Sequence, residues 1–255
     1  MTRLLLPNGP KFMPQSLDAI ILSGGAGLRL RDITGNGPKG LATVAGRPFL
    51  ELLLRQLRRN GFHRAILAVG CGADAIRSQF GEQAFGLELA YALEPSPLGT
   101  GGALRNAVDL VKSDAALVMN GDSYTGTSLQ DFITDHRQSE AEISIVVVPV
   151  DGRADCGTIL LDGTGRLTRF SEKQVASDTN YANAGIYILA RRIFYDLPAG
   201  TQVSLERELL PHWLEQGHNI RAFIWPGTCV DIGTPERYWS AQQLLVDAER
   251  SNPLL

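Results

Sequence analysis

The chain has 255 residues, of which 44% are hydrophobic and 20% are charged, and its formal net charge is −3. A chain of this length buries enough apolar surface to fold without disulfide or metal cross-links. The small negative charge excludes electrostatic binding to nucleic acid or to anionic membrane lipid as the basis of function. Any anionic substrate must therefore be held by a local group of cations and amide N–H groups.

The first 16 residues have the composition of a flexible tail, because three prolines interrupt a short apolar stretch. That stretch is too short for a signal sequence, and no run reaches the roughly 18 apolar residues that a membrane-spanning helix needs. The three cysteines, Cys71, Cys156 and Cys229, show no zinc-ligand spacing. We therefore expect a flexible tail over 1–16, a single domain over 17–255, reduced thiols and a cytoplasmic location.

Strand and helix patterns alternate in the first half of the chain. Apolar runs of strand length occur at 17–23, 64–69, 87–93 and 115–119. Apolar residues at helical spacing occur between these runs at 49–60, 74–80 and 102–111. Gly61 stands where a glycine that ends a helix is expected. This alternation predicts a mostly parallel sheet with helices on both of its faces.

The second half is richer in strands. Strand-like segments occur at 142–150, 157–161, 167–171 and 184–190, with few helical patterns between them. Helical patterns return at 205–216 and 236–249. The sequence therefore predicts an α/β fold with a mixed, mostly parallel central sheet and a small antiparallel part.

A glycine-rich segment follows the first predicted strand, with Gly24, Gly25 and Gly27 within four residues. Successive glycines let main-chain N–H groups approach phosphate oxygens that a Cβ atom would hold away. The segment matches neither a P-loop, which requires G-x-x-x-x-G-K-[ST], nor a dinucleotide fingerprint, whose third glycine position holds Leu30. By itself it is also compatible with an ordinary turn between a strand and a helix.

Basic residues follow this segment at Arg29, Arg31 and Lys39. Amide groups combined with arginine and lysine side chains can hold a triphosphate, although a solvated charge cluster has the same composition. Further along the chain, Asp122 follows the predicted strand 115–119. It thus stands at the strand end where open α/β sheets bind their ligands.

Six segments resemble, in the same order, the motifs of the sugar-1-phosphate nucleotidyltransferases. They are Leu-Ser-Gly-Gly-Ala-Gly-Leu-Arg-Leu at 22–30 with Pro-Lys at 38–39, Glu-Pro-Ser-Pro-Leu-Gly-Thr-Gly-Gly-Ala at 94–103, Asn-Gly-Asp at 120–122, Glu-Lys at 172–173, Asn-Ala-Gly at 183–185 and Val-Asp-Ile-Gly-Thr-Pro at 230–235. The resemblance runs from residue 17 to about residue 243. It implies a Rossmann-like (GT-A-like) form of the predicted fold, whose antiparallel part binds the sugar substrate. It also implies transfer of a nucleotidyl group to a sugar 1-phosphate.

The resemblance implies a nucleotide-binding set made of Leu22, Ser23, Gly24, Gly25, Gly27, Leu98, Gly99, Thr100, Asn120 and Gly121. Segment 98–102 would form the wall beside the nucleobase, with Thr100 as the candidate for a direct contact. Without the resemblance, this segment is equally a glycine-rich turn before a helix. Arg29 and Lys39 would grip the triphosphate, and Lys173 would neutralise the sugar phosphate; these three are the implied catalytic residues.

The implied sugar-binding residues are Glu172, Asn183, Gly185 and Glu206. For Glu206 the alternative is a favourable charge near the start of a helix. Asp122 and Asp231 are the implied ligands of Mg²⁺, an ion that favours one or two protein carboxylates together with phosphate oxygens and water. Each aspartate alternatively belongs to a turn or a helix cap.

The segments at 97–103 and 230–238 resemble most the manno-configured branch of the family, which includes the mannose-1-phosphate guanylyltransferases. Within that branch, the sequence is most similar to the D-glycero-α-D-manno-heptose 1-phosphate guanylyltransferases of bacterial surface polysaccharide biosynthesis. We therefore expect GTP and a heptose 1-phosphate as substrates, and the resemblance allows a homodimer.

A thymidylyl-, uridylyl- or cytidylyltransferase is the enzymatic alternative. A catalytically silent sensor of sugar nucleotides would be expected to lose Arg29, Lys39, Asp122 or Asp231, and all four are present.

Overall fold

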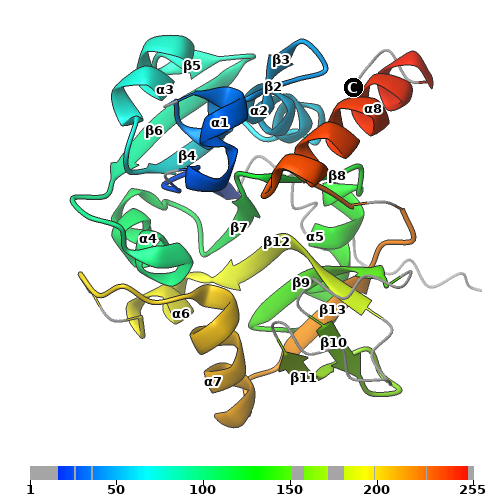
Figure 1. The fold of residues 1–255 in the computed structure, drawn as a ribbon. Coiled ribbons are helices and arrows are strands. Elements are labelled where there is room, and N and C mark those ends of the chain that lie inside the picture. The colour runs from blue at the N-terminus through cyan, green and yellow to red at the C-terminus, as the bar shows by residue number, and fades with distance from the viewer. Residues whose placement is uncertain are drawn as a thin grey trace, which may run out of the picture.

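The computed structural model describes residues 17–25, 27–35, 37–150, 158–171, 181–197, 199–227 and 229–251. The expected tail over 1–16 and the predicted site residues Glu172 and Lys173 lie outside this part of the chain. Within it, one ten-stranded sheet crosses the molecule, accompanied by two sheets of two strands each (Figure 1). The expected α/β fold with a large, mostly parallel central sheet is confirmed.

Four parallel strands form the first half of the large sheet. They are β1 (Asp18–Leu22), β4 (Arg64–Val69), β6 (Leu87–Leu93) and β7 (Ala115–Asn120). Strand β1 lies between β4 and β7 and is parallel to both, and β6 extends the sheet beside β4. The middle strands β1, β4 and β7 are almost continuously buried, as expected for parallel strands covered on both faces.

The second half of the sheet is mixed. It contains β9 (Ile143–Pro149), β10 (Thr158–Leu161), β11 (Leu167–Ser171), β12 (Tyr181–Ala190) and β13 (Ile220–Ile224). Strand β12 is antiparallel to both β7 and β9, so it joins the two halves at the middle of the molecule in Figure 1. It begins three residues earlier than the predicted strand 184–190. The short β5 (Gln83–Ala84) closes the other edge beside β6.

Helices cover both faces of the sheet, as predicted. One face carries α2 (Phe49–Arg59), α3 (Ala73–Phe80), α5 (Leu129–Gln138) and α8 (Pro235–Ser251). The other carries α4 (Gly99–Ala107), η4 (Val108–Leu110), α6 (Arg191–Tyr195), the π-helical turn η5 (Leu205–Leu209) and α7 (Leu210–Glu215). Alternate residues of β1 separate the two cores, since Ile21 packs on the first face and Ile20 on the second.

Several elements differ from the sequence-based expectation. The helix expected at 102–111 begins at Gly99, and α5 was not predicted at all. The signal for α5 exists, because the Ser128 side chain caps its first turn by accepting a hydrogen bond from the Asp131 N–H at 3.2 Å. The shorter elements are η2 (Leu28–Leu30), α1 (Arg31–Thr34), η3 (Lys39–Leu41), β2 (Thr43–Val44), β3 (Arg47–Pro48), β8 (Ser123–Thr125) and β14 (Cys229–Asp231).

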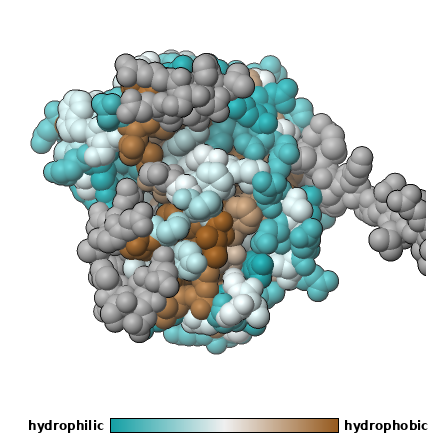
Figure 2. All heavy atoms as spheres, turned by 90° about the vertical axis from the view of Figure 1, so that its right-hand side faces the viewer, coloured by the Kyte–Doolittle hydropathy of each residue, from teal (hydrophilic) through white to brown (hydrophobic). Residues whose placement is uncertain are grey.

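Apolar side chains are exposed at several places on the described part of the surface. No described helix combines the length and the apolar character needed to cross a membrane. Figure 2 shows apolar residues gathered in the middle of one face and bordered by hydrophilic ones. The large apolar side chains exposed in the described residues are Leu93, Tyr195, Ile224, Trp239 and Leu244. They come from four different elements, and apolar residues exposed singly are normal on protein surfaces.

Candidate active site

The carboxyl ends of β1 and β7 meet at one edge of the sheet. Leu22, the last residue of β1, pairs with Asn120, the last residue of β7. The Gly121 N–H donates to the Leu22 carbonyl at 2.9 Å, and the Ser23 N–H donates to the Ala68 carbonyl at 2.8 Å. The glycine-rich segment and the Asn-Gly-Asp segment are therefore neighbours, although almost 100 residues separate them in the sequence.

Glycine is required at this edge by close contacts. A Cβ atom on Gly121 would lie 2.5 Å from the carbonyl oxygen of Leu22. A Cβ atom on Gly24 would meet the carboxylate of Glu94, the end of a flexible side chain that would have to move aside. Gly27 has a φ of +60°, a conformation that other residues rarely adopt. The loop after β1 therefore packs closely against its surroundings and is more than an ordinary turn.

Lys39 brings a cation to this edge. It begins the 3₁₀ turn η3, and its Nζ atom lies 2.6 Å from Oδ2 of Asp122. The lysine side chain is mostly buried, with 15% exposed, whereas that of the aspartate is 36% exposed. The exposed Arg29 lies in η2, immediately after the glycine-rich loop. Two of the three predicted catalytic cations are thus placed beside the loop, and Lys173 lies outside the described residues.

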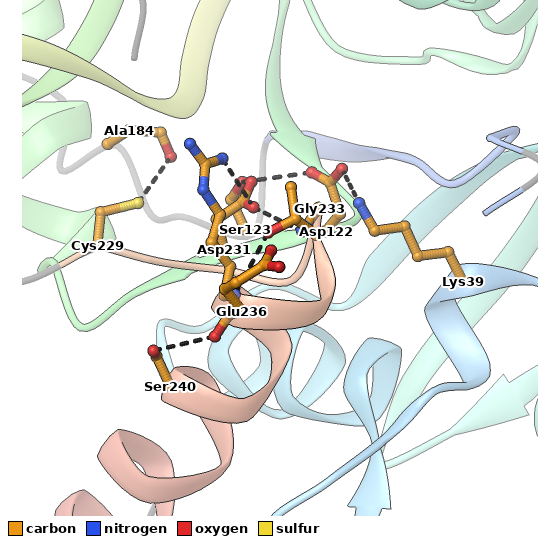
Figure 3. Close-up of polar contacts among 11 residues, drawn as sticks. Lys39, Asp122, Ser123, Ala184, Cys229, Asp231, Gly233, Glu236 and Ser240 are labelled. Carbon is orange, nitrogen blue, oxygen red and sulfur yellow. Dashed lines mark hydrogen bonds and ion pairs between the residues drawn. The ribbon is translucent and has the colours of Figure 1, made fainter. Parts of the chain in front are cut away.

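A small antiparallel sheet positions Asp231, the second predicted carboxylate, near Asp122. Strands β8 and β14 pair so that Asp231 lies opposite Ser123. The Ser123 Oγ atom lies 3.3 Å from Oδ1 of Asp122 and 3.5 Å from Oδ2 of Asp231 (Figure 3). Asp231 Oδ1 also accepts hydrogen bonds from the Gly233 N–H at 2.6 Å and from Arg237 Nη1 at 3.1 Å. Asp231 therefore stabilises its own turn, which agrees with the alternative that this aspartate belongs to a turn. It also lies near Asp122.

The segment proposed as the nucleobase wall packs against residues 201–206. Gly99 and Gly102 permit this contact, because Cβ atoms at these positions would lie 2.6 Å from the Val203 carbonyl oxygen and 2.5 Å from the Thr201 carbonyl oxygen. The Val203 N–H donates to the Leu98 carbonyl at 2.9 Å. Gly99 and Gly102 therefore serve tight packing, which explains why this helix begins earlier than its apolar pattern predicts.

Thr100 is engaged within the protein. Its Oγ1 donates to Oε2 of Glu206 at 2.6 Å and accepts from the Leu205 N–H at 2.8 Å. The single hydroxyl proton of Thr100 is thus directed at Glu206. Its predicted contact with a nucleobase stays a prediction, and such a contact would use the methyl group or the remaining lone pair of the hydroxyl.

Glu94 is a residue of this edge to which the sequence assigned no role. Its Oε2 atom accepts a hydrogen bond from the Leu98 N–H at 3.1 Å, and its carboxylate lies over Gly24. Burial raises the pKa of this half-buried carboxyl group, and the Leu98 N–H partly offsets that effect. Glu94 thus stands between the glycine-rich loop and the proposed wall. The only sequence signal was its place at the start of the motif at 94–103.

The predicted sugar-binding residues in the described chain come together beside Asn120. Asn183 Nδ2 donates to the Tyr187 hydroxyl at 2.6 Å, and Asn183 Oδ1 accepts from the Gly185 N–H at 2.9 Å. A Cβ atom on Gly185 would lie 2.9 Å from Asn120 Nδ2. Glu206 Oε1 lies 3.5 Å from that same nitrogen atom. Glu172, the fourth predicted residue, lies outside the described residues.

Known proteins resemble this chain over most of its length. A model of the family described as nucleotidyl transferase matches residues 18–248. A mannose-1-phosphate guanylyltransferase of Mycobacterium tuberculosis is 34% identical over 94% of this chain and 67% of its own length. A D-glycero-alpha-D-manno-heptose 1-phosphate guanylyltransferase of Campylobacter jejuni is 32% identical over 88% of this chain and 97% of its own.

A solved structure has a similar fold over most of this chain. The crystal structure of HddC from Yersinia pseudotuberculosis superimposes with a TM-score of 0.79 at 31% identity, covering 90% of this chain and 99% of that one. The same protein has also been solved in complex with GMP-PN.

Proposed function

The chain belongs to the nucleotidyl transferase family and is a sugar-1-phosphate nucleotidyltransferase, and we propose that its nucleotide is GTP and its sugar D-glycero-α-D-manno-heptose 1-phosphate. The observation that carries the activity is the meeting of the glycine-rich loop, Lys39 and Asp122 at one sheet edge. The heptose is supported by the motifs at 97–103 and 230–238 and by the relatives that act on that sugar. We place the reaction in the cytoplasm, for surface polysaccharide biosynthesis, and homodimerisation stays a prediction.

In the proposed reaction, an oxygen atom of the sugar 1-phosphate attacks the α-phosphorus of GTP. One new P–O bond forms, the bond between the α- and β-phosphoryl groups breaks, and pyrophosphate leaves with the released electron pair. The attacking oxygen is already anionic, so no catalytic base is needed. Repulsion between two polyanions is the main barrier, and positioning together with fixed positive charge lowers it. Arg29 and Lys39 supply that charge on the triphosphate side, and Lys173 supplies it on the sugar side.

Glu94 supports the choice of GTP. A carboxylate only accepts hydrogen bonds, and guanine presents two neighbouring donors, N1–H and N2–H, on one edge. Uracil and thymine present a single N–H between two carbonyl oxygens, which a carboxylate would repel. Since Glu94 lies over Gly24 and beside Leu98, at the junction of the loop and the wall, its carboxylate is available to the edge of a base.

We also propose that Asp122 and Asp231 hold Mg²⁺. The donor set fits, because two carboxylates approach one serine hydroxyl and leave phosphate oxygens and water to complete the oxygen ligands. Asp122 pairs with Lys39 and Asp231 pairs with Arg237, so a bound Mg²⁺ would share these carboxylates with the two cations or replace them. When bound, Mg²⁺ would supply positive charge that polarises the phosphate oxygens.

A pyrophosphate-release assay tests this proposal. The enzyme is incubated with Mg²⁺ and with each combination of GTP, ATP, UTP, CTP and dTTP with heptose 1-phosphate, mannose 1-phosphate and glucose 1-phosphate. We expect the highest kcat/KM with GTP and the heptose. A preference for mannose 1-phosphate or for another nucleotide would correct the substrates and keep the reaction class. Nucleotide binding without release from any pair would instead support the sensor.

A further inference from the structure

The buried hydroxyl of Tyr187 joins two of the residues predicted to bind the sugar. Tyr187 lies in β12 and is completely buried. Its hydroxyl accepts a hydrogen bond from Asn183 Nδ2 at 2.6 Å and donates one to Glu206 Oε1 at 3.3 Å. A phenylalanine would fill the same space in the core, and a buried hydroxyl is costly unless it is paired. The partners of this hydroxyl therefore indicate what it does.

The contact between Tyr187 and Asn183 depends on an irregularity in β12. Residues four apart in a regular strand are about 13 Å from each other, because each residue adds about 3.3 Å. The register of β12 against β9 shifts between these two residues, and Gly185 between them has a φ of +73°. The strand is thus locally bent, and the long tyrosine side chain spans the remaining distance to the amide.

This contact fixes which way the Asn183 amide points. Nδ2 faces the Tyr187 hydroxyl, while Oδ1 faces the Gly185 N–H at 2.9 Å. These two bonds use half of the four hydrogen-bonding positions of an amide group. One N–H and one lone pair remain, in known directions, for a ligand.

Glu206 is held from two sides. The Tyr187 hydroxyl approaches its Oε1 atom, and Thr100 Oγ1 donates to its Oε2 atom at 2.6 Å. Ser204 Oγ lies 3.3 Å from the same Oε2 atom. Glu206 is the second residue of the π-helical turn η5, and such turns often occur at functional sites. A continuous set of hydrogen bonds thus runs from the proposed nucleobase wall to Asn183.

We propose that Tyr187 is a positioning residue for the sugar 1-phosphate. Its hydroxyl sets the orientation of the Asn183 amide and of the Glu206 carboxylate, so that both are aligned before the sugar binds. The inference rests on the proposed function, because it requires these two residues to contact the sugar. Tyr187 itself touches neither substrate.

The test compares Y187F with the wild-type enzyme in the pyrophosphate-release assay, and KM is measured separately for both substrates. We expect KM for the sugar phosphate to rise roughly tenfold, the effect of losing one hydrogen bond that orients the site, while KM for GTP changes less than about twofold. Y91F is the matched control. It also removes a hydroxyl that donates to a protein acceptor, the Gly81 carbonyl, but at the far edge of the sheet. We expect Y91F to leave both KM values unchanged.

A second pair of variants tests whether Tyr187 acts through Asn183. In an N183A background, Y187F should add little further increase in KM for the sugar phosphate, because the oriented amide is already absent. The double variant also removes both partners of one buried hydrogen bond, so it keeps the test available if Y187F alone unfolds. Additive effects of N183A and Y187F would overturn the inference, as would equal effects of Y187F on both KM values. A wild-type enzyme without activity would instead refute the proposed function.

Discussion

The ammonium group of Lys39 lies 2.6 Å from the carboxylate of Asp122, although 83 residues separate them in the sequence. Lys39 lies in the segment that follows β1. Asp122 follows β7, the parallel neighbour of β1. A positive and a negative side chain are therefore held together at the sheet edge where the triphosphate and Mg²⁺ are proposed to meet.

We expect D122N to lower turnover by about a hundredfold or more, because it removes the partner of Lys39 and a proposed metal ligand while keeping the shape of the side chain. The pair is partly exposed, so the variant should unfold at nearly the wild-type temperature. Pyrophosphate release at saturating Mg²⁺ and thermal unfolding measure the two effects. D109N, at an exposed position in η4, is the control. Wild-type turnover of D122N would refute the metal assignment.

We expect E94Q to reduce the preference for GTP over UTP, measured as the ratio of kcat/KM values, by roughly tenfold to a hundredfold. An amide offers one donor and one acceptor, which suit the N3–H group and a carbonyl oxygen of uracil. E82Q changes an exposed carboxylate that pairs with Arg77 and should leave the ratio unchanged. An unchanged ratio in E94Q would show that Glu94 does not select the base.

We expect G121A to lower both activity and stability. The new Cβ atom would lie 2.5 Å from the Leu22 carbonyl oxygen, so the backbone must move at the point where β1 and β7 end. Strain of this kind typically costs about 1–3 kcal/mol, and we expect at least a tenfold loss of kcat/KM from the displaced loop. G126A is the matched control, since no atom beyond the neighbouring residues of the chain lies within 4 Å of its added methyl group. Equal behaviour of the two variants would contradict the close packing of this edge.

We expect K173A to raise KM for the sugar phosphate about tenfold or more and to leave KM for GTP nearly unchanged. This prediction rests on the Glu-Lys motif at 172–173 and on the strength of a hydrogen bond between an ammonium group and a phosphate. Steady-state kinetics with each substrate varied in turn provide the measurement. K112A, at an exposed position, is the control. Similar increases in both KM values would argue against a specific contact with the sugar phosphate.

The fifth prediction concerns pH and stability. Burial lowers the pKa of His136 from 6.5 to about 4, with a smaller contribution from Arg137, and its Nδ1 atom lies 2.7 Å from Ser144 Oγ. Between pH 4 and 6.5 the unfolded chain binds a proton at this position that the folded chain does not. Stability contributed by neutral His136 is therefore present above pH 6.5 and is lost as the pH falls towards 4.

We expect the free energy of unfolding of the wild-type protein to decrease by about 1–2 kcal/mol more between pH 7 and pH 5 than that of H136N. Urea unfolding at the two pH values measures this difference. H63N, at an exposed histidine, should retain the wild-type dependence. The same pH dependence in H136N and in the wild type would exclude His136 as its source.

Local sequence patterns were sufficient for much of the fold. The strands at 64–69, 87–93 and 167–171 were predicted at their observed bounds, because each is a compact run of strand-like residues. Helix α5 escaped prediction because only its buried face is apolar, with Leu129, Phe132 and Ile133 among polar neighbours. The early start of α4 was also not predicted from the sequence. Glycine has a low helix propensity, and the glycines at this start are explained by their close contacts with Val203 and Thr201.

The sequence by itself determined the reaction class, because the glycine-rich segment, Lys39 and Asp122 belong to short motifs that are recognisable without a structure. Only the tertiary structure decided that Asp231 lies near Asp122, that Glu94 covers Gly24 and that Tyr187 joins Asn183 to Glu206. The reason is physical. A motif reflects what neighbouring residues can do together, whereas contacts between distant residues depend on strand register, on bends such as that at Gly185 and on the packing of side chains between elements.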